Sequence, residues 1–197
     1  MLFRSDGRVE VSTWPAHSIF SRDARLLYVS GETAGDVTVI DAAARATVGR
    51  IVHGGGDAMG LALVADGKTL YVAAGENKRI LKIDTATSKI VGEIGLPGVV
   101  HEATLTLDGK FLYTTLRKLN KVVVIRTADD RIVATILQKG YPDLVTMEPS
   151  GRYALVTNRY ADQVTVIDLA SHTQVRAIAV GKAPHGMALR PARPGAR

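Results

Sequence analysis

The fold is decided by a stretch in the middle of the chain, residues 60–94, which reads GLALVADGKTLYVAAGENKRILKIDTATSKIVGEI. It contains four runs of β-branched, aromatic and small apolar residues, separated by Asp-Gly-Lys, Gly-Glu-Asn-Lys and Asp-Thr-Ala-Thr-Ser. Short apolar runs bounded by such turn sequences predict antiparallel strands joined by hairpins. No run keeps the 3.6-residue period of an amphipathic helix, so we expect an all-β protein.

This unit recurs along the chain every 42 or 43 residues. The same steps separate Tyr28, Tyr71, Tyr113 and Leu155, then Ile40, Ile83, Ile125 and Ile167, and again Ile51, Ile94, Ile136 and Ile178. A repeat of this length is a supersecondary unit that must stack on its neighbours to bury its apolar faces. Four strands per unit predict a β-propeller of four-stranded antiparallel blades. A β-solenoid fits less well, because its coils are usually shorter. The four full repeats are expected at about 17–58, 59–100, 101–142 and 143–184, in one domain spanning 1–197.

The repeat also resembles a known family. It runs Gly-x-Ala-Leu-x-x-Asp-Gly-Lys-x-Leu-Tyr-Val, then Val-x-Val-Ile-Asp, then Lys-Ile-Val-x-x-Ile, and residues 155–158 nearly spell Tyr-Val-Thr-Asn. In this it is similar to the YVTN-type β-propeller repeat, over roughly residues 15–191. The resemblance implies a propeller related to surface-layer, quinoprotein-associated or haem-carrying nitrite-reductase-like proteins, and it favours a periplasmic or extracellular location. The chain departs from the pattern at Arg126, where other repeats have aspartate, and at Ser150-Gly151 in place of Asp-Gly.

The two ends of the chain bear on the size of the ring. Residues 7–14 resemble an outer strand with no blade before it, and residues 185–190 an inner strand with no blade after it; the tail 191–197 is expected to be disordered. Propellers typically close with about four to eight blades. The four repeats therefore close alone, pair with a second copy into an eight-bladed ring, or form part of a longer chain. An open arc would expose an apolar blade face, so we favour a homodimer or a larger propeller.

Composition argues against several classes of protein. The 197 residues carry 25 lysines and arginines against 19 acids, a formal net charge of +6, with no block of like charge of the kind that grips nucleic acid. The absence of cysteine excludes disulfides, thiolate metal sites and a cysteine nucleophile. No apolar run suits a signal peptide or a membrane-spanning helix. We therefore expect no nucleic-acid partner and no membrane insertion, while the compartment stays open.

The repeat register locates a candidate site. The position just before the inner strand holds Met59, His101, Asp143 and His185 in successive repeats, and His17 lies one residue out of this register. Equivalent positions form a ring around a propeller's channel, so these side chains should gather at one mouth. Imidazole and carboxylate groups suit a divalent metal, an axial haem ligand or a general base. We favour a structural role, in which the histidines bond neighbouring backbone, over a ligand site or a metal site.

The hairpin tips on the same face carry an excess of basic residues, which suits an anionic ligand. The sequence thus predicts a non-catalytic binding or scaffold propeller that presents its loops to a protein partner or a small anionic ligand, without a cofactor. The candidate ligand-binding residues are His101, His185, Asp143, His17, Arg117 and Arg159. The alternative is a propeller enzyme or cofactor carrier, of lyase, lactonase, haem-binding or metal-binding type, that uses the histidines. The repeated Asp41, Asp84 and Asp168 are interpreted as turn caps rather than catalytic groups.

Overall fold

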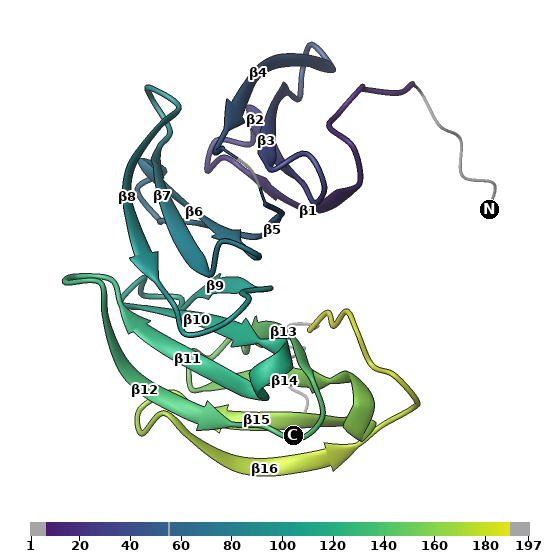
Figure 1. The fold of residues 1–197 in the computed structure, drawn as a ribbon, viewed down its shortest axis with the longest axis vertical. Helices are drawn as coiled ribbons and strands as arrows, with labels where there is room; N and C mark the ends of the chain where they lie inside the picture. The colour runs from purple at the N-terminus through teal and green to yellow at the C-terminus, as the bar shows by residue number, and fades with distance from the viewer. Residues whose placement is uncertain (1–6, 55, 190–197) are drawn as a thin grey trace, which may run out of the picture. The chain divides into compact units, whose positions relative to one another are not determined.

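The computed structural model describes residues 7–54 and 56–189. Within these ranges the chain forms sixteen strands, arranged in four antiparallel sheets of four, and two short 3₁₀ helices (Figure 1). The prediction of an all-β chain built from four-stranded blades is confirmed. No helix in the described ranges is long and apolar enough to cross a membrane. The chain divides into two compact units, Met1–Gly95 and Leu96–Arg197, each with two of the sheets.

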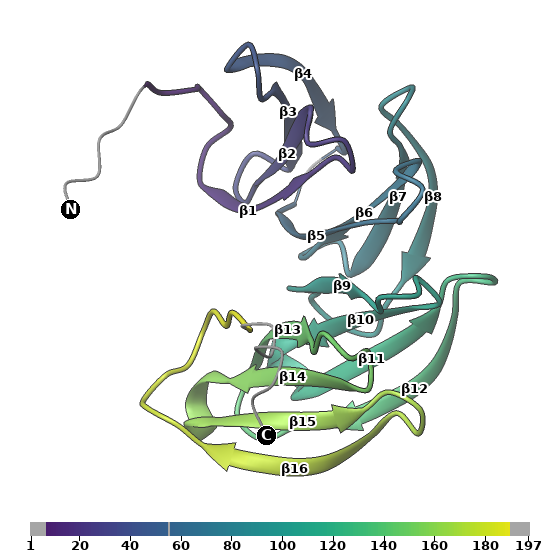
Figure 2. The ribbon, with the colours of Figure 1, turned by 180° about the vertical axis from the view of Figure 1, so that it is seen from behind.

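The first unit holds two blades, each a meander in which consecutive strands lie side by side (Figure 2). The strands of the first blade are β1 (Pro15–Phe20), β2 (Leu26–Gly31), β3 (Asp36–Asp41) and β4 (Ala46–Val52). Those of the second blade are β5 (Ala58–Leu63), β6 (Thr69–Ala74), β7 (Arg79–Asp84) and β8 (Lys89–Gly95). In each blade the strands pair in the order in which they follow one another along the chain.

The second unit has the same design, with a 3₁₀ helix between the second and third strands of both blades. The third blade consists of β9 (Ala103–Leu105), β10 (Phe111–Leu116), η1 (Arg117–Leu119), β11 (Lys121–Arg126) and β12 (Arg131–Leu137). The fourth consists of β13 (Pro142–Met147), β14 (Tyr153–Asn158), η2 (Arg159–Ala161), β15 (Gln163–Asp168) and β16 (Thr173–Ala179). The tips that carry Arg117 and Arg159 are therefore single helical turns at the same end of their blades.

Turn chemistry explains where the inner strands end. In the second blade the side chain of Asp66 accepts the backbone N–H of Lys68 (2.9 Å), and Gly67 has a φ of 73°, in the left-handed region that favours glycine. In the fourth blade Gly151 has a φ of 72°, while Ser150 takes the place of the aspartate. The departure from Asp-Gly leaves the turn intact, because glycine keeps the left-handed position.

The aspartates that end the third strands bond to their own turns. The Oδ1 atom of Asp84 accepts both the backbone N–H and the hydroxyl of Thr87, each at 2.7 Å. The Oδ1 atom of Asp168 accepts the backbone N–H of Ser171 at 3.0 Å. These hydrogen bonds are the ones that the turn-cap interpretation predicts. In the third blade, Arg126 takes the place of this aspartate at the end of the third strand.

Apolar side chains pack between consecutive blades within each unit. The core of the first unit includes Tyr28, Val37, Val39 and Ile51 from the first blade and Leu61, Leu70, Val72, Leu81 and Ile83 from the second. The core of the second unit includes Tyr113, Val122, Val124 and Ile136 from the third blade and Val145, Ala154, Val156 and Ile167 from the fourth. Each blade therefore buries an apolar face against its neighbour, which is the physical reason for the repeat.

The orphan strands predicted at the chain ends are not formed in the described residues. Residues 7–14 contain no strand; the N–H of Ser12 donates to Thr38 Oγ1 (3.2 Å) on the first blade. Residues 185–189 contain no strand either, and the hydroxyl of Thr157 donates to the carbonyl oxygen of His185 (2.8 Å). A strand needs the backbone of a neighbouring strand, whereas here side chains of the adjacent blade make these hydrogen bonds. Residue 190 and the predicted tail 191–197 lie outside the described residues.

Candidate functional site

The candidate site is built around Asp143, near the start of β13. This strand pairs with β14 in regular register except between Pro142 and Val145, where the register shifts. A bulge of this kind redirects a side chain relative to the regular alternation of a strand. The Asp143 side chain is completely buried. A buried carboxylate needs charged or hydrogen-bonding partners, and four segments of the second unit supply them.

Two arginines from successive blades bind this carboxylate. Arg117, at the start of η1, donates from Nη2 to Asp143 Oδ1. Arg159, at the start of η2, places Nε 3.0 Å from Asp143 Oδ2. Both side chains are partly exposed, so each guanidinium lies between the buried acid and the surface. The basic hairpin tips singled out in the sequence thus converge on the same acid as the predicted ring of site residues.

Two histidines flank the same carboxylate. His101 is buried, with Nδ1 3.7 Å from Asp143 Oδ1 and 3.3 Å from the Asp143 carbonyl oxygen. His185 places Nε2 3.7 Å from Asp143 Oδ2, and its side chain is 48% exposed. His101, Asp143 and His185 are the three repeat-equivalent residues predicted to gather at one mouth. The second unit brings them together, and of the two imidazoles His185 is the more exposed to solvent.

Threonine hydroxyls hold these segments in place from blade to blade. Thr115 Oγ1 donates to the carbonyl oxygen of Asp143 (2.9 Å), and Thr157 Oγ1 donates to that of His185 (2.8 Å). The two bonds are related by one repeat, since both donor and acceptor move by 42 residues. Thr115 and Thr157 were not among the predicted site residues. Their recurrence at the same position of the second strand is the sequence signal for this role.

Glu102 adds a second buried carboxyl group to the site. Burial raises the pKa of Glu102 to about 8, although the Thr104 hydroxyl, which donates to Oε1 (3.1 Å), and the charge of Arg117 lower it. At neutral pH this carboxyl is therefore protonated. The site then holds two guanidinium charges and a single carboxylate charge, that of Asp143, which leaves an excess of positive charge.

His17, the remaining predicted site residue, lies in β1 of the first unit. Its backbone N–H donates to Ser30 Oγ (3.0 Å). Strand β1 has the same irregularity as β13, between Pro15 and Ser18. Counting from the paired residues, Ala16 corresponds to Asp143, and His17 is one residue further along. The structure thus agrees with the one-residue offset noted in the sequence.

The charge of the Asp143 site bears on its chemistry. A divalent cation at Asp143 would meet two guanidinium groups that already neutralise the carboxylate, so these residues do not fit a metal. Arginine instead matches the planar oxygens of carboxylates and phosphates. The arrangement therefore suits an anion bound at the exposed edges of Arg117, Arg159 and His185.

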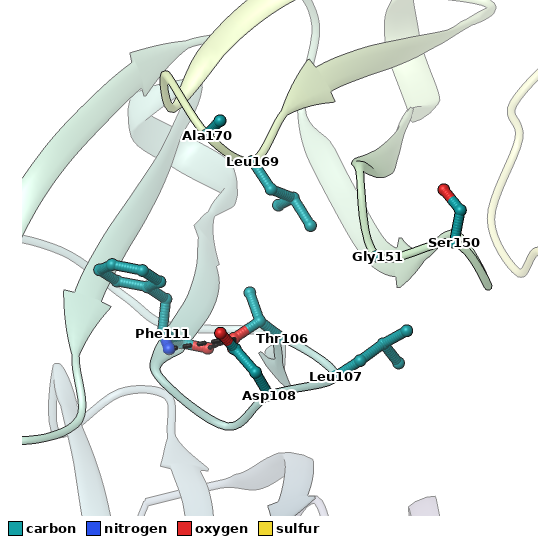
Figure 3. Close-up of a pocket in the computed structure, with 8 residues that line it drawn as sticks. All are labelled: Thr106, Leu107, Asp108, Phe111, Ser150, Gly151, Leu169 and Ala170. Atoms are coloured by element: carbon teal, nitrogen blue, oxygen red, sulfur yellow. Dashed lines mark hydrogen bonds between the residues drawn. The ribbon is translucent and has the colours of Figure 1, made fainter.

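The opposite ends of the strands form a different feature. In the second unit, the turns that follow β9, β13 and β15 line a pocket of about 410 Å³, with Leu107, Phe111 and Leu169 on its wall (Figure 3). In the first unit the equivalent turns line a pocket of about 690 Å³ that includes Arg22 and Tyr28. Because the pocket recurs in register, it reflects how consecutive blades meet, and it lies apart from the Asp143 site.

Comparisons with known proteins agree with the architecture. A family model for YNCE-like beta-propellers matches residues 135–193. Hydrazine synthase of Kuenenia stuttgartiensis has a similar structure, with a TM-score of 0.78 and 24% identity over 89% of this chain. The β-propeller domain of Myceliophteria thermophila Cps50 (Swd1) has a TM-score of 0.75 and 14% identity over 88% of this chain. No curated protein matches the sequence significantly.

These likenesses show the fold alone. The chain spans about half the length of the two similar structures, 52% and 57% of their chains respectively. The family match spans all four strands of the fourth blade, and its range includes Asp143, Arg159 and His185. With its four-stranded blades and 42-residue register, the chain is a β-propeller protein whose repeats are consistent with the YVTN-type family.

Proposed function

We propose that this protein is a non-catalytic binding β-propeller that holds an anionic group of its ligand at the Asp143 site. The observation that supports this is the convergence of Arg117 and Arg159, from two successive blades, beside the half-exposed His185. Asp143 forms ion pairs with both guanidinium groups, which would hold them in position before a ligand arrives. Pre-positioned donors lose less conformational entropy on binding than mobile ones.

The charge balance is the second support. With Glu102 protonated at neutral pH, one buried carboxylate faces two guanidinium groups. A carboxylate or phosphate of the ligand would offset the remaining positive charge.

Calorimetric titration with citrate at low ionic strength tests the proposal. Wild-type protein should bind the anion, and Arg159→Gln should weaken binding about 10- to 100-fold, the usual effect of losing a hydrogen bond to a charged group. Arg159→Lys keeps the positive charge but loses the planar guanidinium, so its affinity for citrate should lie between those of wild type and Arg159→Gln. Arg159 is chosen because it is the more exposed of the two arginines.

The matched control is Arg152→Gln. Arg152 lies over the ring of Tyr153, 4.9 Å from its centroid, at the other end of the strands, so its loss should leave citrate binding unchanged. Equal affinity of wild type and Arg159→Gln, or an equal loss in the Arg152 variant, would contradict a specific anion site.

The enzyme or cofactor-carrier alternative has one observation in its favour. His101 and His185 both approach the same carboxylate at 3.7 Å, an arrangement that could hold a histidine in position for proton transfer. The two guanidinium groups weigh against a metal there. Elemental analysis and an absorbance scan of the purified protein separate the two functions: a stoichiometric metal or a Soret band would favour the cofactor carrier.

A further inference from the structure

A pair of aromatic rings, Tyr141 and the exposed Tyr160, adjoins the Asp143 site. The guanidinium of Arg117 lies over the Tyr141 ring, 5.4 Å from its centroid. The Tyr141 ring in turn contacts the Tyr160 ring, with centroids 4.9 Å apart and planes inclined by 39°. Tyr160 is 71% exposed. The contacts run from the buried acid through Arg117 and Tyr141 to a tyrosine ring that faces solvent.

Backbone contacts hold this stack in place. The N–H of Tyr160 donates to the carbonyl oxygen of Gly140 (2.9 Å), and the N–H of Arg159 donates to that of Tyr141 (3.1 Å). On the other side, the N–H of Tyr141 donates to the side chain of Asn120, at the end of η1 (2.8 Å). A Cβ atom added to Gly140 would lie 2.7 Å from the backbone nitrogen of Ala161. The turn 139–141 is therefore packed tightly between η1 and η2, and the three segments form one surface.

This surface is strongly basic. The segments 117–121, 139–141 and 159–162 contain five cations and one acid. The acid is Asp162, whose carboxylate already accepts a hydrogen bond from the backbone N–H of Ala183 (2.9 Å). Lys118 and Lys139 are exposed. A cationic surface that also exposes an aromatic ring attracts acidic partners that offer an apolar side chain.

We propose that this surface docks an acidic protein segment, with a large apolar or aromatic side chain of the partner packing on Tyr160. The inference rests on the proposed function, because it extends the anion site at Asp143 to a partner class. A protein segment is favoured over a small molecule because Tyr160 is mostly exposed, whereas small-molecule sites enclose most of their ligand. Tyrosine and arginine are also the side chains that dominate hot spots of protein interfaces.

The test uses two fluorescein-labelled peptides, Glu-Glu-Phe-Glu-Glu and Glu-Glu-Ala-Glu-Glu, and measures fluorescence anisotropy. Wild-type protein should bind the phenylalanine peptide about tenfold more tightly than the alanine peptide. Tyr160→Ala should remove that difference while leaving the alanine peptide unaffected, since an exposed hot-spot ring contributes through packing alone. Tyr160→Phe keeps the ring and should retain the preference.

The controls distinguish this inference from the anion site itself. Leu107→Ala removes an exposed apolar side chain at the opposite end of the strands and should change neither affinity. Arg159→Gln should weaken both peptides alike. Equal binding of the two peptides, or a preference that survives Tyr160→Ala, overturns the inference while leaving citrate binding intact. Failure of both citrate and the peptides to bind overturns the proposed function as well. Tight binding of heparin that ignores Tyr160 would point to a general polyanion surface and also overturn the inference.

Discussion

His101, Asp143 and His185 occupy one position in three successive repeats, yet their surroundings differ. Asp143 is fully buried between two arginines, His101 is buried beside its carbonyl oxygen, and His185 is half exposed. The difference follows from what each residue faces. Asp143 is reached by Arg117 of the third blade and by Arg159 of its own blade, and its negative charge is stabilised by both guanidinium groups.

Among single residues, Glu102 makes the folding stability depend on pH. Burial raises the pKa of Glu102 from its ordinary 4.5 to about 8, so the folded protein holds a proton that the unfolded chain loses above about 4.5. Stability from this group is therefore fully present below pH 4.5 and falls as the pH rises toward 8. Glu102→Gln mimics the protonated carboxyl, and we expect it to raise the melting temperature over wild type at pH 8 and to have little effect at pH 4.5.

The expected gain at pH 8 is on the order of a few kcal/mol, because each pKa unit corresponds to about 1.4 kcal/mol. Thermal melts of wild type and variant at the two pH values measure it. The exposed Glu76, changed to Gln in the same way, is the control and should show no such pH-dependent gain. An equal change in the melting temperatures of wild type and Glu102→Gln between pH 4.5 and pH 8 would contradict the buried, protonated state.

At the scale of the element, the turns between third and outer strands decide where each blade folds back. The backbone N–H of Ser171 lowers the pKa of Asp168 and caps the turn with the ionised carboxylate. Asp168→Ala should lower the melting temperature by about 2–4 °C, the usual shift for the loss of one such interaction in a domain of this size. Asp168→Asn keeps an acceptor oxygen, so its melting temperature should fall by less than that of Asp168→Ala.

The pH dependence of this effect has the opposite sign to that of Glu102. Because the folded-state pKa of Asp168 is lowered, its stabilisation is present above the ordinary pKa of 3.8 and is lost as the pH falls through the folded-state value. The difference between wild type and Asp168→Ala should therefore shrink below about pH 4. Citrate binding should be unchanged, since Asp168 is at the far end of the strands from Asp143. Lost binding with an unchanged melting temperature would mean that the aspartate is functional rather than structural.

At the scale of the whole molecule, the fourth blade exposes an apolar face. The equivalent face is buried in the first and third blades. Ile51 and Ile136, at the same position of the outer strand in the first and third blades, are 3% and 7% exposed. Ile178, the equivalent residue of the fourth blade, is 39% exposed. By contrast, Val175 is exposed like its equivalents in the other blades, so the difference is confined to the face that a following blade would cover.

We propose that a second copy of the chain covers this face, as the sequence predicts for an incomplete ring. Light scattering on a dilute sample should then give a mass twice that of the 21.0 kDa chain. Ile178→Asp places a charge on the face and should produce monomers, since burial of an unpaired charge is costly. Val175→Asp is the control and should leave the dimer intact. A cooperative wild-type monomer would contradict self-association and favour closure of the four blades on their own.

The sequence by itself determined the architecture, for reasons that are local and repeated. Asp84 and Asp168 cap their own turns, Gly67 and Gly151 supply the same left-handed backbone, and short apolar runs between the turns define the strands. These features need no knowledge of distant parts of the chain. The 42-residue step adds the order of the blades, and with it the prediction that His101, Asp143 and His185 are neighbours.

Only the tertiary structure decided what those neighbours do. The repeat register identifies equivalent positions. The bulge at the start of β13 depends instead on the pairing with β14, and it bears on where the Asp143 side chain lies. The sequence also could not decide whether the strands predicted at 7–14 and 185–190 form, because a strand forms only where another backbone is available to pair. The raised pKa of Glu102 and the stack of Arg117 on Tyr141 come from burial and from contacts between blades. Such effects depend on distance in space, which a repeat period does not contain.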